Sequence, residues 1–406
     1  MYQTPLQTQI QTPPPAVVSV AATAPVCRVL ILTFAYWEGL SRLPAVLHQA
    51  GCEVSVFGPP ANYPALSRYV THRTSVAGDM EQLLDYLQQY LAQPQHQADW
   101  IVIGDDPLLY ALEKRQQQSW VQHVLRHCIA PDKLGFATSK IQFLQACQSA
   151  GILVPAFQIC HTRQDLQQAA QRFGFPLVLK EAQGYAGLAV RILHRMEECA
   201  QIDLSHAWIA QEFITGRLLS ASAVFRHGQL LSLFSYYRSR TWGELGPSAA
   251  IQFQSFPGLD HIVQSSGKLS GFHGLCGFDL IQQEGSGDLY LLEQNFRPTL
   301  TLDLGRLAGV DVVGAIKRML AGEPVPDEWR QSAQNEKQLA VIPLFPQDVF
   351  RALDAGDLSG LLRWVWDPRY WSYLRWHEPR IALRNWRHVM AKLRQNISRL
   401  LRFSTS

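Results

Sequence analysis

Apolar strands that alternate with amphipathic helices constrain the N-terminal third of this 406-residue chain most strongly. RVLILTF is a continuous apolar run, as expected of a strand buried on both faces of a parallel sheet. The next segments predict helix, strand, helix and strand in turn: SRLPAVLHQA, CEVSVFG, EQLLDYLQQYLAQ and DWIVIGDD. This alternation predicts a doubly wound parallel-sheet α/β domain over residues 27–130. No GxGxxG follows the first strand, so a dinucleotide site is not expected.

The following region has a helix first and then several short strands. Thr138 or Ser139 is the expected cap of a helix over KIQFLQACQSAG, which ends at Gly151. GFPLVLK and AWIAQEFITG predict strands, and ASAVFRHGQLLSLFSYY predicts a hairpin that turns at His227-Gly228. Helices are expected over GLDHIVQSSGKLSGF and over residues 307–320.

A polar patch interrupts the hairpin predicted from GFDLIQQEGSGDLYLLEQNFRPT. Side chains two apart share a face of a strand, so Glu293, Asn295 and Arg297 lie together. If the hairpin is symmetric about Ser286, Asp279 lies opposite Glu293, with Cβ atoms about 5 Å apart. Facing carboxylates are destabilising unless something neutralises them, and hard oxygen ligands suit Mg²⁺. The alternative is a solvated polar face in which Arg297 pairs with Glu293.

Two lysines precede this hairpin. Lys180 closes the strand PLVLK, beside a loop that holds Gly184 and Gly187. Glycine permits close backbone approach to phosphates, and such a loop can close over them. Lys140 stands near the start of the expected helix. Each feature alone is common on protein surfaces, whereas their order along the chain is far more specific.

With these features in this order, the sequence resembles the ATP-grasp superfamily of carboxylate–amine ligases over about residues 130–320. The resemblance implies a two-subdomain ATP-grasp fold over 131–320, with a lid subdomain at about 151–210. It implies that Lys140 and Lys180 contact nucleotide phosphate. It also implies an adenine hinge at four consecutive residues: Gln211, Glu212, Phe213 and Ile214. Within the superfamily, QEFI, EQNFRP and the aromatic, basic tail are similar to mycosporine-glycine-type ligases.

The same resemblance assigns the metal and the catalytic groups. Asp279, Glu293 and Asn295 match the family's Mg²⁺ ligands, which Mn²⁺ can also use. Lys180 and Arg297 are then expected to stabilise the transferring phosphoryl group.

Two positions depart from the family pattern. Leu218 and Leu219 stand where members often have an acid that contacts ribose, so Glu212 is the expected substitute. Gly277 stands where some members have a catalytic arginine, so Arg240 or Arg238 is expected to supply the missing positive charge.

These residues predict an ATP-dependent ligase that forms a C–N bond between a phosphoryl-activated carboxylate, or an equivalent acidic oxygen, and an amine. The expected cofactors are ATP and Mg²⁺, and the expected partners are small-molecule carboxylate and amine substrates. The alternative is a non-catalytic ATP-binding scaffold or regulatory protein. The set of metal-ligating residues argues against that alternative, because a pure scaffold has little need of Mg²⁺ ligands.

Composition indicates the expected cellular location and the expected kinds of partner. The seven cysteines are scattered without a CxxC pair, which favours reduced thiols and a cytoplasmic location. Residues 1–26 are rich in Gln, Thr and Pro, have no basic stretch typical of a signal peptide, and predict a disordered tail. The net charge of +3 does not indicate a nucleic-acid binder. A homodimer is the default expectation.

The C-terminal section, residues 321–406, differs in composition. From position 361 onward it holds nine arginines and one lysine against two acids, with five of the eleven tryptophans. Apolar residues recur there at helical spacing from Leu383 onward. The pattern predicts a basic amphipathic helix, which contacts an anionic membrane surface, binds a partner protein or packs on its own domain. Packing is favoured because tryptophans also fill cores.

Overall fold

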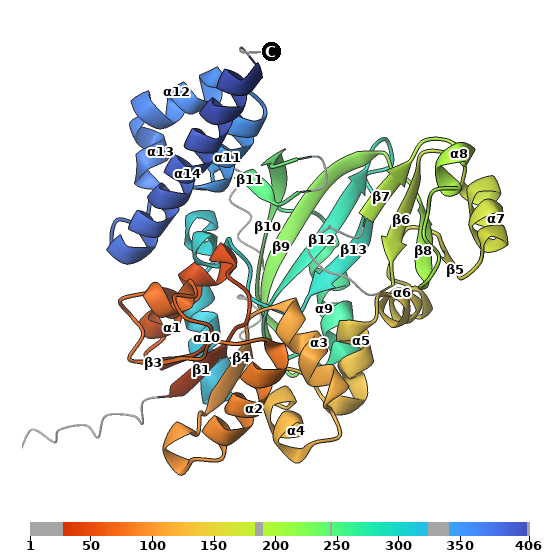
Figure 1. Ribbon diagram of the computed structural model, residues 1–406. Helices are drawn as coiled ribbons and strands as arrows, with labels where there is room; N and C mark the ends of the chain where they lie inside the picture. The colour runs from red at the N-terminus through yellow and green to blue at the C-terminus, as the bar shows by residue number, and fades with distance from the viewer. Residues whose placement is uncertain (1–26, 183–189, 244–245, 324–340, 404–406) are drawn as a thin grey trace, which may run out of the picture.

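The structure, a computed structural model, describes residues 27–182, 190–243, 246–323 and 341–403. It contains an N-terminal parallel sheet, a small antiparallel sheet, a long central antiparallel sheet and a C-terminal group of helices (Figure 1). The expected mixed α/β and α+β fold class is therefore confirmed. The predicted tail over residues 1–26 lies outside the described residues.

The N-terminal sheet has the order β3-β2-β1-β4, and its strands are parallel. Alternate residues of its first strand point to different cores, because Leu30 and Leu32 pack in one cluster while Val29 and Ile31 pack in another. Both faces of the sheet are thus covered, as predicted for a doubly wound domain. The strands are β1 (Arg28–Leu32), β2 (Glu53–Gly58), β3 (His72–Ser75) and β4 (Trp100–Ile103). The helices are α1 (Leu43–Gln49), α2 (Met80–Leu91), α3 (Asp106–Lys114) and α4 (Ser119–Leu125).

The small sheet is antiparallel and has the order β5-β8-β6-β7. Its core forms around Trp208, which is 2% exposed. Two helices lead into this unit, and Ser139 caps the second by accepting from the Gln142 amide at 3.3 Å. The strands are β5 (Phe157–Cys160), β6 (Leu177–Glu181), β7 (Val190–Leu193) and β8 (Trp208–Glu212). The helices are α5 (Leu134–Thr138), α6 (Lys140–Ser149), α7 (Arg163–Phe173) and α8 (Met196–Cys199).

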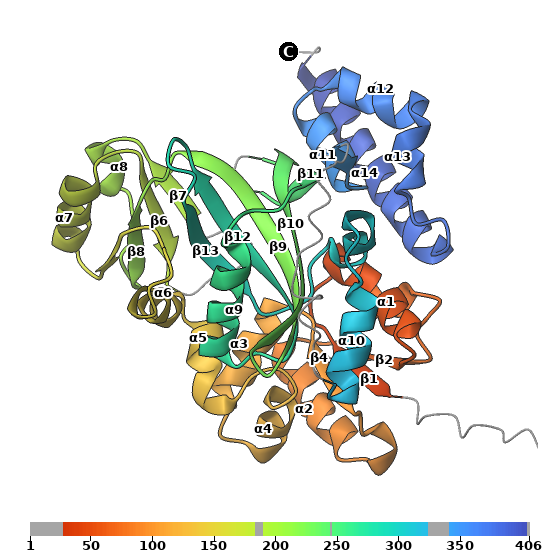
Figure 2. The same ribbon diagram turned by 180° about the vertical axis from the view of Figure 1, so that it is seen from behind.

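The central sheet has the order β13-β12-β9-β10-β11-β14. The predicted turn is confirmed, because His227 and Gly228 between β9 and β10 both have positive φ, at 46° and 80°. One face packs against α5, α6 and the helix α9, and the other packs on the N-terminal domain and α10 (Figure 2). The elements are β9 (Gly216–Arg226), β10 (Gln229–Thr241), β11 (Ser248–Phe253), α9 (Leu259–Ser270), β12 (Gly274–Gln283), β13 (Leu289–Asn295), α10 (Val312–Ala321) and β14 (Ile342–Pro343).

The helix expected over residues 307–320 begins later than predicted. Residues Leu302–Ala308 form a 3-10 helix, and Gly309, with φ of 77°, then turns the chain. The α-helix starts after Asp311, whose carboxylate accepts from the Gly314 amide at 2.7 Å. The aspartate cap therefore sets the start of α10.

The C-terminal helices form a cap over the central sheet and the N-terminal domain. Asp348, 1% exposed, joins the cap to the sheet by accepting from Arg240 on β10 and from Trp364 within the cap. Glu378 receives the Ser67 hydroxyl at 2.6 Å and so ties the cap to the N-terminal domain. Among the described helices, none combines the length and the hydropathy needed to cross a bilayer. The helices are α11 (Gln347–Asp354), α12 (Leu358–Trp366), α13 (Pro368–Ser372) and α14 (Pro379–Phe403).

Candidate active site

Asp279 on β12 lies opposite Glu293 on β13, as the hairpin symmetry predicted. Hairpin symmetry alone does not produce this pairing. Leu280 pairs with Leu291, and a β-bulge separates that pair from the pair formed by Asp279 and Glu293. The bulge adds one residue to β13 and brings Glu293, rather than Leu292, opposite Asp279. The two carboxylates consequently share one end of the hairpin, beside the small sheet.

Three donors surround the Asp279 carboxylate. Arg238 Nη2 and Ser220 Oγ donate to Oδ1, the latter at 2.7 Å, and Asn295 Nδ2 donates to Oδ2 at 3.2 Å. Arg238 Nε also donates to Ser220 Oγ at 2.9 Å, which fixes the guanidinium. Burial acts to raise the pKa of Asp279, but the charge of Arg238 and these hydrogen bonds outweigh it and hold the pKa below its usual value.

Glu293 is less well compensated. Its nearest cation is Lys140, whose Nζ lies 3.8 Å from Oε1. Burial raises the pKa of Glu293, the lysine opposes this, and the facing charge of Asp279 raises it further. A cation placed between the two carboxylates would reverse that shift, because it would favour the charged form of both.

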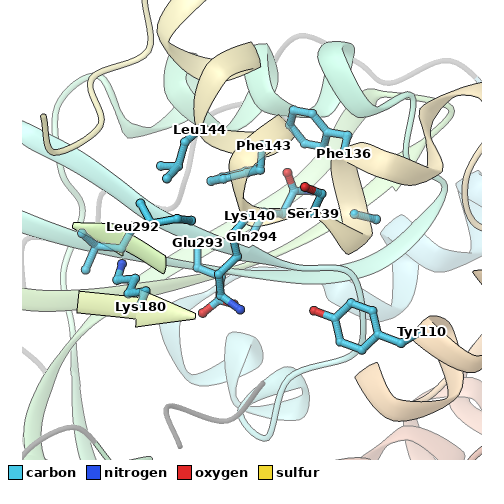
Figure 3. A pocket seen from close by; sticks show the side chains of 12 residues that line it. Tyr110, Phe136, Ser139, Lys140, Phe143, Leu144, Lys180, Leu292, Glu293 and Gln294 are labelled. Carbon is cyan, nitrogen blue, oxygen red and sulfur yellow. The ribbon is translucent and has the colours of Figure 1, made fainter. Parts of the chain in front are cut away.

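Lys180, the last residue but one of β6, reaches the same place from the small sheet (Figure 3). Burial lowers the pKa of Lys180 to about 8; Glu293 acts against this, whereas neighbouring Lys140 lowers the pKa further. Two lysines held this closely, one of them desolvated, form a site that an anion would stabilise. Polyphosphate fits this requirement.

The lysines and Glu293 line a pocket of about 410 Å³, including solvent at its mouth. The strand β13, helix α6 and the small sheet form its walls, and Tyr110 approaches from α3 (Figure 3). Apolar side chains cover one part and charged groups another, which is typical of a small-molecule site. The lining residues are Tyr110, Phe136, Ala137, Ser139, Lys140, Phe143, Leu144, Lys180, Ile209, Leu292, Glu293 and Gln294.

The predicted adenine hinge begins on β8, the strand that also carries the pocket residue Ile209. Gln211 lies two residues beyond Ile209 on β8 and therefore shares its face. Gln211 is 1% exposed, and its Nε2 finds no hydrogen-bond partner among the described residues. A buried donor without a partner is costly unless a ligand supplies an acceptor.

The remaining hinge residues have separate environments. Glu212 Oε1 accepts from the Ala156 amide at 2.7 Å, so the carboxylate helps to hold the strand entering β5. Phe213 is 39% exposed, whereas Ile214 is buried. Gly184 and Gly187 lie outside the described residues.

Arg297 joins the hairpin to the N-terminal domain. Its Nε donates to Asp106 Oδ2 at 2.7 Å, and its guanidinium lies 4.2 Å from the Trp37 ring centre. The alternative pairing with Glu293 is therefore wrong. Asp106 occupies the first turn of α3, at the carboxyl end of β4, where ligands bind in open α/β sheets. The sequence offered one signal for it, the two acids that end DWIVIGDD.

Arg240 does not lie at this site. It pairs with Asp348 in the cap, with Nε to Oδ1 at 2.9 Å, because β10 has register shifts on both sides of it. Arg238 is the residue that meets Asp279. The structure also explains why glycine and not arginine stands at position 277. A Cβ there would lie 2.5 Å from Thr299 Cγ2, and a longer side chain would clash.

The donor set fits Mg²⁺ better than a transition metal. Asp279, Glu293 and Asn295 offer hard oxygens, and no cluster of three or more His, Cys, Asp or Glu suited to a metal occurs in the part of the chain that the structure describes. Mg²⁺ needs few protein ligands when phosphates supply the rest. Asn295 would have to turn its amide, because it presents Nδ2 to Asp279.

Comparison with known proteins agrees with this geometry. Residues 137–301 match the family model described as the ATP-grasp domain. This chain contains an ATP-grasp domain. The predicted resemblance to the ATP-grasp superfamily is therefore confirmed for residues 137–301, whereas the similarity to mycosporine-glycine-type ligases stays a prediction.

The chain also resembles individual proteins at low sequence identity. It is 25% identical to a carbamoyl-phosphate synthase of Methanobrevibacter smithii in an alignment of 235 residues that covers 55% of this chain and 63% of that protein. The structure resembles an L-amino acid ligase from Bacillus licheniformis, with a TM-score of 0.55, 16% identity and coverage of 75% and 76% of the two chains. It also resembles the biotin carboxylase domain of Hydrogenobacter thermophilus 2-oxoglutarate carboxylase, solved with MgADP and bicarbonate, at TM-score 0.57, 15% identity and coverage of 73% and 70%.

Proposed function

We propose that this ATP-grasp chain is an ATP-dependent ligase that joins a carboxylate, or an equivalent acidic oxygen, to an amine. One observation carries the proposal: Lys140, Lys180 and Glu293 line one pocket, and Asp279 lies directly opposite Glu293 on the neighbouring strand. Two cations beside two facing acids suit a metal–polyphosphate complex, which needs both charges at close range.

In the proposed reaction, a carboxylate oxygen of the substrate attacks the γ-phosphorus of ATP. An O–P bond forms, the bond between the γ-phosphorus and the β,γ-bridging oxygen breaks, and ADP leaves. The amine nitrogen then attacks the carbonyl carbon, phosphate leaves, and the nitrogen gives up a proton. Lys180 and Lys140 hold the phosphates, and Arg238 and Arg297 offer positive charge where the carboxylate must approach.

Mg²⁺, when bound, would neutralise charge on the transferring phosphoryl group. Asp279, Glu293 and Asn295 are the residues that would hold it. Arg238 presently compensates Asp279, so its guanidinium would turn toward substrate when the metal is bound. Gln211 would donate its unused hydrogen bond to the nucleotide base.

The decisive experiment supplies ATP, Mg²⁺ and pairs of carboxylate and amine substrates, and follows ADP and phosphate together. The ligase proposal expects ADP release that requires both members of a productive pair. A scaffold would instead bind nucleotide and release no ADP across the screen. Release that depends on a carboxylate alone would indicate phosphorylation without ligation.

The proposed partners and cellular location are those expected of such a ligase. The proposed partners are small-molecule substrates, without nucleic acid, and the proposed location is the cytoplasm, which the seven free thiols support. A homodimer remains the default proposal. The proposed division of the chain is 27–130, 131–320 and 321–406, with the lid at about 151–210.

A further inference from the structure

The C-terminal cap exposes most of its tryptophans. Trp366 is 77% exposed, Trp376 62%, Trp371 47% and Trp386 41%. Only Trp364, at 7%, fills the core of the cap as the favoured sequence interpretation expected. The cap does pack on its own domain, but four large aromatic side chains remain on its surface. Apolar surface of this kind marks an interaction site.

Three of the exposed tryptophans, Trp371, Trp376 and Trp386, are linked to one another through the buried Trp364. Trp371 Nε1 donates to the Trp364 carbonyl at 2.7 Å, and Trp376 Nε1 donates to the Trp371 carbonyl at 3.1 Å. The Phe345 ring lies 5.3 Å from that of Trp364 and 4.9 Å from that of Trp386. The aromatic groups of α12, α13 and α14 are therefore neighbours.

Aliphatic side chains extend this surface along α12. Leu358, Leu362 and Val365 are 72%, 55% and 53% exposed. Their spacing of four and three residues places them on one side of the helix, next to Trp366. An exposed helix face of this composition is not explained by packing within the described chain.

The long helix α14 combines apolar and basic groups in one stripe. Arg380, Leu383, Arg387, Met390 and Arg394 follow one another at intervals of three or four residues, and all five are exposed. The three arginines form no ion pair with any residue that the structure describes. Arginine can lay its aliphatic stem along apolar surface while its head meets an anion.

We propose that this face, formed by the four exposed tryptophans, the α12 side chains and the α14 stripe, docks on an anionic lipid bilayer. Tryptophan is favoured where an apolar region meets water, and basic residues are attracted to negatively charged headgroups. From position 361 onward the chain carries nine arginines and one lysine against two acids, so its charge complements such a surface. The proposal is independent of the ligase reaction.

Charge and position favour a membrane over other occupants. A second copy of the same face would place arginines against arginines, which is unfavourable. The cap lies at the end of the molecule away from the small sheet (Figures 1 and 2). The pocket beside the small sheet therefore stays accessible while the cap is docked.

The test measures partition of the full-length chain onto vesicles of phosphatidylcholine with and without phosphatidylglycerol. We expect binding to the anionic vesicles, weakening with salt, and little to neutral vesicles. Trp366→Ser with Trp376→Ser should reduce the partition about tenfold, because two anchoring rings are lost. Arg387→Gln with Arg394→Gln should reduce it about 30-fold.

Matched controls remove the same kinds of group elsewhere. Tyr86→Ser with Leu153→Ser removes two exposed apolar side chains, at 52% and 49% exposure, and Arg126→Gln with Arg172→Gln removes two exposed charges. Both should partition like the wild type, and all variants should keep its melting temperature. The proposal would be overturned if the control variants lost as much vesicle binding as the corresponding cap variants. It would also be overturned if the wild type did not bind anionic vesicles.

Two further results would assign the face to another occupant and reject the membrane. Sedimentation of the wild type as a dimer and of the tryptophan variant as a monomer would indicate a second copy. Binding of a peptide of residues 1–26 to a chain that lacks those residues, with no vesicle binding by that shortened chain, would indicate that the N-terminal segment occupies the face.

Discussion

Asp279 and Glu293 face each other across β12 and β13, but different cations compensate them. Asp279 is enclosed by Arg238, Ser220 and Asn295, whereas Glu293 has only Lys140 at 3.8 Å as its nearest cation. Accordingly the pKa of Asp279 is held low and that of Glu293 is raised, chiefly by burial. This asymmetry marks Glu293 as the acid that gains most from a bound metal.

Replacing Glu293 therefore tests the metal site. Glu293→Gln keeps the shape of the side chain and removes its charge, so we expect at least a 100-fold loss of ADP release, in line with loss of a group that stabilises phosphoryl transfer. The apparent Mg²⁺ requirement should also rise. Glu284→Gln in the exposed turn of the same hairpin is the control and should behave as wild type. Full turnover in Glu293→Gln would remove the metal assignment.

The two arginines of β10 should separate activity from stability. Arg238→Gln is expected to lower turnover about 100-fold, because Arg238 is the guanidinium at Asp279. Mg²⁺ should raise its melting temperature more than that of the wild type, because Asp279 then lacks its cation. Arg240→Gln should keep turnover within about threefold but lose about 1–3 kcal/mol of stability, since Asp348 loses one partner. Steady-state kinetics and thermal melts of both variants test this assignment of Arg238 to the site and Arg240 to the cap. Loss of turnover in Arg240→Gln with normal turnover in Arg238→Gln would contradict it.

Lys180 should give nucleotide binding a distinctive pH dependence. Burial lowers its pKa to about 8, so the free protein loses this positive charge as the pH rises through that value. Affinity for ATP should then decline above about pH 8, and binding at pH 8.5 should take up protons, because phosphate raises the lysine pKa again. Calorimetry in buffers of different ionisation enthalpy measures the uptake. Lys180→Arg should bind without it, because arginine stays charged.

Gln211 should affect folding and binding in opposite directions. Its buried Nε2 lacks a partner among the described residues, so Gln211→Leu removes an uncompensated donor and should raise the melting temperature of the free protein. The same change should weaken ATP binding about tenfold, because the nucleotide base loses that donor. The melting temperature and the ATP affinity of Gln211→Leu and of the wild type test both expectations. Unchanged ATP affinity would show that Gln211 does not face the base.

Periodicity and turn chemistry made most of the fold predictable. Buried strands such as β1 and the turn at His227-Gly228 have local signals that survive in the structure. The strand β3 was missed because it is short, polar and largely exposed, so it carries no apolar pattern. The late start of α10 was missed because an aspartate cap and a glycine turn interrupt an otherwise helical pattern.

The site was predictable only where its residues are close in sequence. Asp279 and Glu293 were paired correctly, although a bulge rather than hairpin symmetry aligns them. The choice between Arg238 and Arg240 depends on strand irregularities that leave no mark in the sequence. The contact between Arg297 and Asp106 joins residues 191 positions apart, and no local pattern reveals such a pair.

The most direct test of the central claim is an equilibrium titration of the wild-type chain with ATP, in Mg²⁺ and in excess chelator. The account predicts saturable binding of one nucleotide per chain at or below about 1 mM, weakened at least tenfold without metal and again by Lys180→Ala. Binding that ignores the metal and both substitutions Lys180→Ala and Glu293→Gln, or no saturable binding at all, would contradict it.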